Sequence, residues 1–384
     1  MKLSLISIIV INFLVLTYSI EPKELETFYK DYIQSFGYEF EEHEVTTEDG
    51  YILVIWHLTK KDSNPKKVVY FQHGFTCTPW VFFSLKEKSL PFLLLENGYD
   101  VWLGNSRGTI FSLGHVSKDH TDLNGDYWDY SLDELAVKDL PTTIDYIKKS
   151  TSQEKILYIG HSQGTCIFFM LYRHNPTYVE NSIEKFVGLG VVPSLTYTNF
   201  TPLNILDFVY KAIELSMPIT KAIQLNNKQR ALFSNICKKA PYVCRELIDT
   251  LASTHPTYRI DYTEIYPFMY YYPGGTNSNS LLHWSQIHQE KDLVYFNPNY
   301  DKEKECKHYD IEPIKKWKIK AFIQRSDADS FSSYDDVTIL YNSIEDKSNI
   351  LLVDTIDYCH LDELAAESSI QDLYYPIIRF LDNF

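Results

Sequence analysis

The chain has 384 residues, of which 45% are hydrophobic and 23% are charged. These values are typical of a folded globular protein with a large core, so the composition excludes an intrinsically disordered chain. The formal net charge is −15 and the sequence has no long basic run. Nucleic acid is therefore excluded as an expected partner, because phosphate binding needs clustered lysine and arginine.

The first residues have the pattern of a cleaved secretory signal. Lys2 gives a positively charged start, residues 3–16 form an apolar run, and Thr17 and Ser19 are small enough for the −3 and −1 positions of a cleavage site. A membrane anchor is the alternative, but the run is shorter than the roughly 20 residues that span a bilayer. We therefore expect residues 1–19 to be a signal peptide, with no transmembrane segment left after cleavage.

Helices and strands are predicted to alternate after the signal. Residues 24–36 predict an amphipathic helix, and residues 43–56 predict a hairpin around the Asp49-Gly50 turn. Short apolar runs predict buried strands at 67–72, 99–103, 155–160, 183–192, 319–324 and 350–353, and helices are expected at 132–148, with a kink at Pro141, and at 165–174. This alternation predicts an α/β domain with a mostly parallel sheet flanked by helices.

Residues 194–310 break this alternation. They contain helical stretches, an aromatic run at 266–272 and the sequence Pro273-Gly274-Gly275, and they lie between two predicted strands. An insertion at this point would cover the carboxyl ends of the strands, where ligands bind in open α/β sheets. We therefore expect residues 20–193 and 311–384 to form the core, and residues 194–310 to form a mainly helical cap or lid.

The cysteines and one sequon carry further expectations. Six cysteines are too few for a disulfide scaffold in a chain of this length. Cys237 and Cys244 are close enough for one local bridge, and a metal site is the weaker alternative because no CxxC pair is present. The sequon Asn199-Phe200-Thr201 predicts a glycoprotein if the chain enters the secretory pathway.

The strongest chemical signal is Gly160-His161-Ser162-Gln163-Gly164. A predicted buried strand precedes it and a predicted helix follows at once, which is the strand–turn–helix setting that exposes a nucleophilic serine. Ser162 alone is a weak nucleophile and needs a general base and an acid that orients this base. The motif and its setting favour a serine ester hydrolase of the α/β-hydrolase fold over a glycine–serine turn without a chemical role.

In this fold the base is a histidine that follows the acid in the chain. His360 comes after the last predicted strand and is the candidate base. The acid should follow the strand that ends at Gln324, where Asp327 and Asp329 are both available. Asp335 and Asp336 are better explained as acids in the first turn of a helix.

An ester hydrolase also needs two backbone N–H groups aimed at the developing oxyanion. The residue after the nucleophile, Gln163, is expected to supply one N–H, and Phe75 in the sequence Gln72-His73-Gly74-Phe75 is expected to supply the other. We expect His73 to hold this loop by packing or hydrogen bonding and not to act in catalysis.

The chain resembles the acid lipase family, which includes lysosomal acid lipase and gastric lipase. The similar stretches run nearly from end to end, at residues 44–53, 72–75, 101–108, 127–134, 139–145, 160–164 and 282–286. The resemblance implies a cap with a mobile lid and hydrolysis of neutral lipid esters. We expect the moving segment to be residues 223–254, which are amphipathic at helical spacing.

The resemblance also separates the two candidate acids. The acid of the family lies eight residues before the valine of an Asp-Val pair, and here Asp336-Val337 gives 337 − 8 = 329. Ser326 and Asp327 replace the two glycines of the family's turn, and Cys359 replaces the asparagine before its histidine. Family members also have three lid cysteines with one bridge, where this chain has two cysteines.

These observations predict a secreted or lysosomal lipase in which Ser162 attacks the ester, His360 is the base and Asp329 orients His360. The expected substrate is a neutral lipid ester, a triacylglycerol or a steryl ester, met at a lipid–water interface. No metal or organic cofactor is expected, and a monomer is assumed. Two alternatives stay open: an esterase for smaller, non-lipid esters, and a non-catalytic lipid-binding protein on a hydrolase scaffold.

Overall fold

The computed structural model describes residues 26–65, 67–198, 220–242, 244–245, 248, 265–303 and 305–383. The predicted signal peptide, the sequon at Asn199 and residues 249–254 of the predicted lid lie outside the described residues. Within the described ranges, no helix is both long enough and apolar enough to span a membrane.

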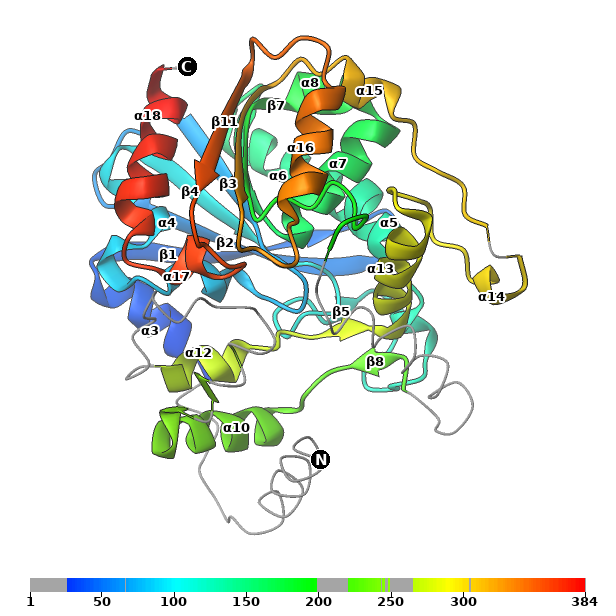
Figure 1. The fold of residues 1–384 in the computed structure, drawn as a ribbon. Helices are drawn as coiled ribbons and strands as arrows, with labels where there is room; N and C mark the ends of the chain where they lie inside the picture. Colours follow the sequence, from blue (N-terminus) through cyan, green and yellow to red (C-terminus); the bar gives the residue numbers. More distant parts are fainter. Residues whose placement is uncertain are drawn as a thin grey trace.

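A nine-stranded sheet occupies the centre of the described structure (Figure 1). Its strands are β1 (Tyr38–Thr46), β2 (Tyr51–Lys60), β3 (Lys67–Gln72), β4 (Tyr99–Gly104), β5 (Gly114–His115), β6 (Ile156–His161), β7 (Ile183–Leu189), β10 (Lys320–Ser326) and β11 (Ile350–Thr355). The order is β1-β2-β4-β3-β6-β7-β10-β11, and β5 pairs with β2. β1 and β2 form an antiparallel hairpin at one edge, and β2 is also antiparallel to β4. The other six strands on this path, β4, β3, β6, β7, β10 and β11, are parallel to one another.

Helices cover both faces of the sheet, so the hydrophobic core has two layers. One layer contains side chains of α5 (Leu132–Glu134), α6 (Leu140–Thr151), α7 (Gln163–His174), α8 (Pro176–Ser182), α15 (Glu312–Lys315) and α16 (Tyr334–Ser343). The other contains side chains of α3 (Phe28–Ser35), α4 (Leu90–Glu96), α17 (Asp362–Ala365) and α18 (Tyr375–Asn383). Figure 1 shows α4 and α18 on one side of the sheet and α6, α7 and α16 on the other.

The strands are apolar on both faces because both faces are covered. In β6, Ile156 and Tyr158 enter one layer of the core, whereas Leu157 and Ile159 enter the other. The edge strand β1 has the opposite character, since its sequence contains several glutamates and most of its residues are exposed or half-buried. A charged edge of this kind discourages pairing with another sheet. The predicted mostly parallel sheet flanked by helices is confirmed.

The region at 132–148, predicted as one helix with a kink at Pro141, contains a π-helical segment in place of the proline kink. A π-helical segment, Leu135–Asp139, joins α5 to α6. Pro141 stands in the first turn of α6, where its missing N–H leaves no intrahelical hydrogen bond unmade. The wider π turn before the proline accommodates the ring without a break in the helix.

The described part of residues 194–310 is mostly helical. It contains the two-stranded sheet β8 (Ala222–Ile223) and β9 (Thr276–Asn277) and the helices α10 (Asn227–Lys239), α12 (Ile265–Tyr271), α13 (Ser278–Glu290) and α14 (Tyr300–Glu303). α10 packs against α12, and Cys237 and Cys244, which the sequence showed only to be close enough for a bridge, form a local disulfide. The bounds of core and cap stay a prediction.

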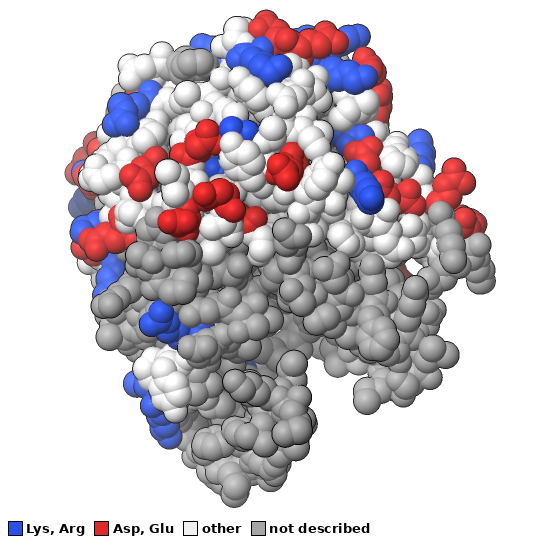
Figure 2. Space-filling view, in the orientation of Figure 1, with Lys and Arg blue, Asp and Glu red and all other residues white. Residues whose placement is uncertain are grey.

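Hydrogen bonds attach this segment to loops at the carboxyl ends of the parallel strands. The Gly274 N–H donates to the carbonyl of Thr76, after β3, and the Gly274 carbonyl accepts from Ile110, after β4. Figure 1 draws α10 and α12 beyond that edge of the sheet. On the face in Figure 2, the acidic and basic side chains of the described residues are interspersed, without a large basic patch.

Candidate active site

The carboxyl edge of the sheet brings three of the predicted site residues together. Ser162 follows β6, Asp329 follows β10 and His360 follows β11, and parallel strands end at the same edge. His360 Nε2 lies 2.7 Å from Ser162 Oγ, and His360 Nδ1 lies 2.9 Å from Asp329 Oδ2. All three residues are buried. The hydrogen bonds thus run in series from the serine hydroxyl to the aspartate carboxylate.

The backbone at Ser162 adopts a conformation that residues other than glycine rarely adopt. Its φ is 55° and its ψ is −119°, a strained state that costs on the order of 1–3 kcal/mol and persists only when the surroundings impose it. The flanking glycines make this sharp turn possible. A Cβ on Gly164 would lie 2.3 Å from the Gln72 carbonyl oxygen, so α7 approaches β3 closely only because glycine is present.

Asp329 and Asp327 have different surroundings. Asp329 Oδ1 accepts hydrogen bonds from the N–H groups of Phe331 and Ser332, at 2.8 and 2.9 Å, while its Oδ2 faces His360. Backbone donors of this kind stabilise a buried carboxylate. Asp327 is exposed, and its Oδ1 accepts from the Asp357 N–H. Of the two candidates, Asp329 is therefore the one in contact with the histidine.

The orientation of His360 suits proton transfer. With Asp329 accepting from Nδ1–H, Nε2 keeps a lone pair that accepts from the Ser162 hydroxyl. This tautomer lets the imidazole remove the hydroxyl proton while the carboxylate stabilises the resulting imidazolium. The Phe331 ring lies 4.9 Å from the His360 ring, centroid to centroid, and adds a packing contact that holds it.

The loop after β3 lies against the serine. A Cβ on Gly74 would lie 3.0 Å from Ser162 Cβ, so only glycine permits this approach. Among the described residues, no hydrogen bond engages the backbone N–H of Phe75 or of Gln163. The ring of Trp284, on α13, packs edge-on against Phe75 at 6.1 Å.

His73 holds this loop, in agreement with the expectation from the sequence. Burial lowers the pKa of His73 to about 4, so its ring is neutral at physiological pH. Nε2 accepts from the Ser106 N–H at 3.2 Å, and Nδ1 therefore donates to the Gly74 carbonyl at 2.8 Å. The ring thus links the loop after β3 to the loop after β4.

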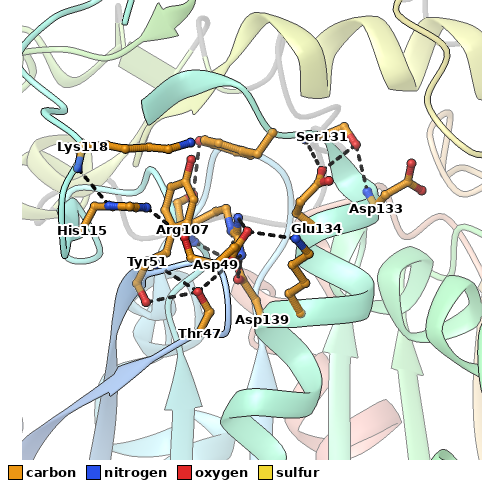
Figure 3. A network of polar contacts seen from close by, with 12 residues as sticks. Thr47, Asp49, Tyr51, Arg107, His115, Lys118, Ser131, Asp133, Glu134 and Asp139 are labelled. Atoms are coloured by element: carbon orange, nitrogen blue, oxygen red, sulfur yellow. Dashed lines mark hydrogen bonds and ion pairs between the residues drawn. The ribbon is translucent and has the colours of Figure 1, made fainter. Parts of the chain in front are cut away.

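The loop after β4 is fixed in turn by Arg107, a residue whose role was not predicted from the sequence (Figure 3). Its guanidinium is fully buried and donates to Asp139 at 2.7 and 2.9 Å and to Asp49 at 2.7 and 3.0 Å. It also lies 3.9 Å above the Tyr51 ring. Burial alone would raise the pKa of Asp49, but the hydrogen bonds from Arg107 and Thr47 lower this pKa overall. The signal in the sequence that could have identified Arg107 is its place within residues 101–108, one of the stretches that resemble the acid lipase family.

Glu363 and His161 lie next to His360, and neither was predicted from the sequence as part of the site. His161 Nε2 donates to the His360 carbonyl at 3.0 Å and lies 3.7 Å from Glu363 Oε2. Burial, followed by the neighbouring His360, lowers the pKa of His161 to about 3. Burial, followed by the Asp329 charge, raises the pKa of Glu363 well above its usual range. Burial thus favours the neutral form of both side chains, which argues against an ion pair at this contact.

The fold and the site define a hydrolase of the α/β-hydrolase class. A family model for the alpha/beta hydrolase fold matches residues 67–360, and a model for the partial alpha/beta-hydrolase lipase region matches residues 29–85. The chain is 32% identical over 381 residues to gastric triacylglycerol lipase of Mus musculus, covering 91% of this chain and 90% of that protein. It is 30% identical over 374 residues to lipase member K of Homo sapiens, covering 92% and 90%. The chain belongs to the α/β-hydrolase lipase family.

Solved structures agree on the fold. A putative lipase from Acinetobacter baumannii has a TM-score of 0.55 at 10% identity and covers 96% of this chain and 100% of that one. A putative lipase from Sulfolobus solfataricus has a TM-score of 0.55 at 15% identity and covers 89% and 98%. The predicted family, fold class and enzyme class are confirmed, and the chain is a carboxylic ester hydrolase.

Proposed function

We propose that this chain hydrolyses esters of neutral lipids through an acyl-enzyme formed on Ser162. The observation that carries the proposal is the hydrogen-bonded series from Ser162 through His360 to Asp329. In the first half of the reaction, His360 takes the hydroxyl proton as Ser162 Oγ attacks the ester carbonyl, and then gives that proton to the leaving alcohol. In the second half, His360 activates a water that hydrolyses the acyl-enzyme.

The N–H groups of Phe75 and Gln163 hold the oxyanion in both halves of this reaction. Support comes from the approach of Gly74 to Ser162, which places the loop after β3 beside the nucleophile. Donors that are fixed before the reaction cost no reorganisation when charge develops on the carbonyl oxygen. No step of this mechanism requires a metal ion or an organic cofactor.

The substrate class follows from the relatives. One of them is named for triacylglycerol and another is named a lipase, which supports a lipid ester as substrate. A triacylglycerol or a steryl ester, met at a lipid–water interface, is the substrate of this proposal. The N-terminal signal pattern supports delivery to the extracellular space or the lysosome.

Replacing the nucleophile tests the mechanism. Ser162→Ala should lower hydrolysis by a factor on the order of 10⁴ to 10⁶ and abolish labelling by a fluorophosphonate probe, because the hydroxyl forms the covalent bond. Ser343→Ala, on α16, is the control and should keep both activities. Hydrolysis by Ser162→Ala within tenfold of wild type would rule out the serine mechanism.

A substrate series tests the lipid assignment separately. Rates on an emulsified long-chain triacylglycerol and on a soluble short-chain ester, each at pH 5 and pH 7.5, should favour the emulsion. A clear preference for the soluble ester would keep the serine mechanism but assign the enzyme to smaller, non-lipid esters.

A further inference from the structure

A pocket with a volume of about 620 Å³ opens at the opposite end of the sheet from Ser162. Its lining includes Glu41 and His43 on β1 and His57 on β2. The hairpin register pairs Glu41 with His57, and residues two apart on a strand share one face. The lining also includes Lys67, the first residue of β3, and Asp100, the second residue of β4, so the pocket lies toward the amino ends of the parallel strands.

The three polar side chains converge within this pocket. One possible ligand atom from each side chain, a ring nitrogen or a carboxylate oxygen, lies within 4.8 Å of the other two. His43 Nε2 is 3.4 Å from Glu41 Oε2, and His57 Nδ1 is 3.9 Å from the same oxygen. Ligands bound tetrahedrally at about 2.0–2.1 Å from zinc lie about 3.3 Å apart. The side chain of Glu41 is 69% exposed and can move the remaining distance by a rotamer change.

His57 is held in an orientation suited to a metal ligand. Its Nε2 lies 2.6 Å from Asp100 Oδ1, and the other carboxylate oxygen of Asp100 accepts from Trp102 Nε1. The His57 ring stacks on the Trp102 ring at 3.9 Å with an interplanar angle of 13°. Because the Asp100 carboxylate accepts a hydrogen bond from His57 Nε2–H, the Nδ1 atom of His57 is unprotonated, and its lone pair lies on the side of Glu41. Metal-binding histidines commonly have such a carboxylate on the second ring nitrogen.

One ring nitrogen of His43 forms a hydrogen bond, and the other is available to bind a metal ion. Nδ1 lies 3.0 Å from the Tyr146 hydroxyl oxygen, whereas Nε2 is buried and has no hydrogen-bond partner of acceptable geometry among the described residues. A buried polar atom without a partner costs free energy that a bound ion would recover.

We propose that Glu41, His43 and His57 bind one divalent transition-metal ion, for which zinc is the best match. Two imidazoles and one carboxylate form a donor set that zinc prefers, and three protein ligands leave a fourth position open toward the pocket. The charges of Glu41 and Asp100 balance the charge of the ion. The site lies at the other end of the sheet from the proposed nucleophile, so it does not depend on the proposed function.

Direct binding measurements test this site. The full-length chain is freed of metal with EDTA, and zinc binding is then followed by calorimetry. Cobalt(II) serves as a second probe, since its visible absorption reports tetrahedral coordination. We expect one high-affinity equivalent of zinc per chain, with His57→Gln and Glu41→Gln each weakening it by at least about tenfold, and Asp100→Asn weakening it by about 10- to 100-fold.

Glu39→Gln is the matched control, because Glu39 lines the same pocket on the same strand face but lies outside the converging set. It removes the same charge as Glu41→Gln and should leave zinc affinity unchanged. Glu41 is too exposed for its substitution to affect folding, so that variant remains informative if His57→Gln misfolds. Absence of saturable zinc binding, or wild-type affinity in Glu41→Gln, would overturn the proposal.

Discussion

Asp327 and Asp329 carry the same chemical group two positions apart, and their contacts separate them. Asp329 receives two backbone N–H groups and faces His360, whereas Asp327 receives one N–H at the surface. The order of residues along the chain could not distinguish them, because it fixes only that an acid follows β10. The spacing to Asp336-Val337 pointed to Asp329, and the contacts agree with that assignment.

Asparagine substitutions test this assignment. Asp329→Asn should lower kcat by a factor of about 10⁴, because the amide stabilises the imidazole tautomer that cannot accept the serine proton. Asp327→Asn should keep kcat within a few-fold of wild type. Steady-state kinetics on a soluble ester provide the measurement, and a larger loss in Asp327→Asn than in Asp329→Asn would show that the assignment is wrong.

Glu363 makes a prediction about stability. A glutamic acid has a pKa of about 4.3 in an unfolded chain, and its pKa is raised in the folded protein. The folded state therefore holds the proton more tightly, and this contribution to stability is fully present below about pH 4 and is lost as the pH rises toward the folded pKa. Both carboxylate oxygens lack a hydrogen bond of acceptable geometry among the described residues, although Gln324 lies nearby.

Glu363→Gln should remove this pH dependence. The variant should match wild type near pH 4 and exceed its free energy of unfolding at pH 7.5, because glutamine has no proton to release on unfolding. Urea unfolding at both pH values measures the difference. Glu367→Gln is the control, since this side chain is 78% exposed. Equal gains at both pH values would argue against a raised pKa of Glu363 in the folded state.

At the scale of elements, apolar runs located the strands well and the irregular turns less well. The run at 155–160 corresponds to β6, because a strand buried on both faces is a short and nearly continuous apolar run. The π-helical segment Leu135–Asp139 was not predicted, since it reflects how α5 and α6 meet and not a residue preference. The Glu41–His57 pairing was missed because it needs the exact hairpin register.

The junction of β6 and α7 carries a prediction. Gly164→Ala should cost at least about 3 kcal/mol, because its Cβ would lie 2.3 Å from a backbone carbonyl of β3 that cannot move alone. Gly37→Ala is the comparison, since its Cβ would meet nothing within 4 Å and only the positive φ of 85° opposes it. That strain costs about 1–2 kcal/mol. Urea unfolding that ranks Gly37→Ala as the more damaging change would contradict this account.

At the scale of the whole molecule, the last helix closes one layer of the core. α18 buries apolar side chains, among them Ile377 and Phe380, against the face of the sheet that α4 also covers. Lys185, on β7, is 2% exposed and donates to the carbonyls of Phe380 and Leu381 at the end of this helix. Its positive charge suits the carboxyl end of a helix dipole.

Ending the chain after Tyr374 should therefore abolish cooperative folding and not merely reduce stability. The deletion exposes the central strands and removes the two carbonyls to which Lys185 donates, a large loss for a domain whose total stability is about 5–15 kcal/mol. Thermal unfolding followed by circular dichroism should lack a sharp transition. Removal of residues 383–384 alone is the control and should retain it.

The order of the site residues along the chain has a consequence for biosynthesis. The serine and its proposed base are 198 positions apart, and the base belongs to the last tenth of the sequence. A chain emerging from the ribosome can form the hairpin, β6 and the sharp turn at Ser162 long before β11 has been translated. Without an imidazole, the serine hydroxyl is a poor nucleophile. The nascent protein thus cannot attack the lipids around it until the segment that contains His360 has been translated.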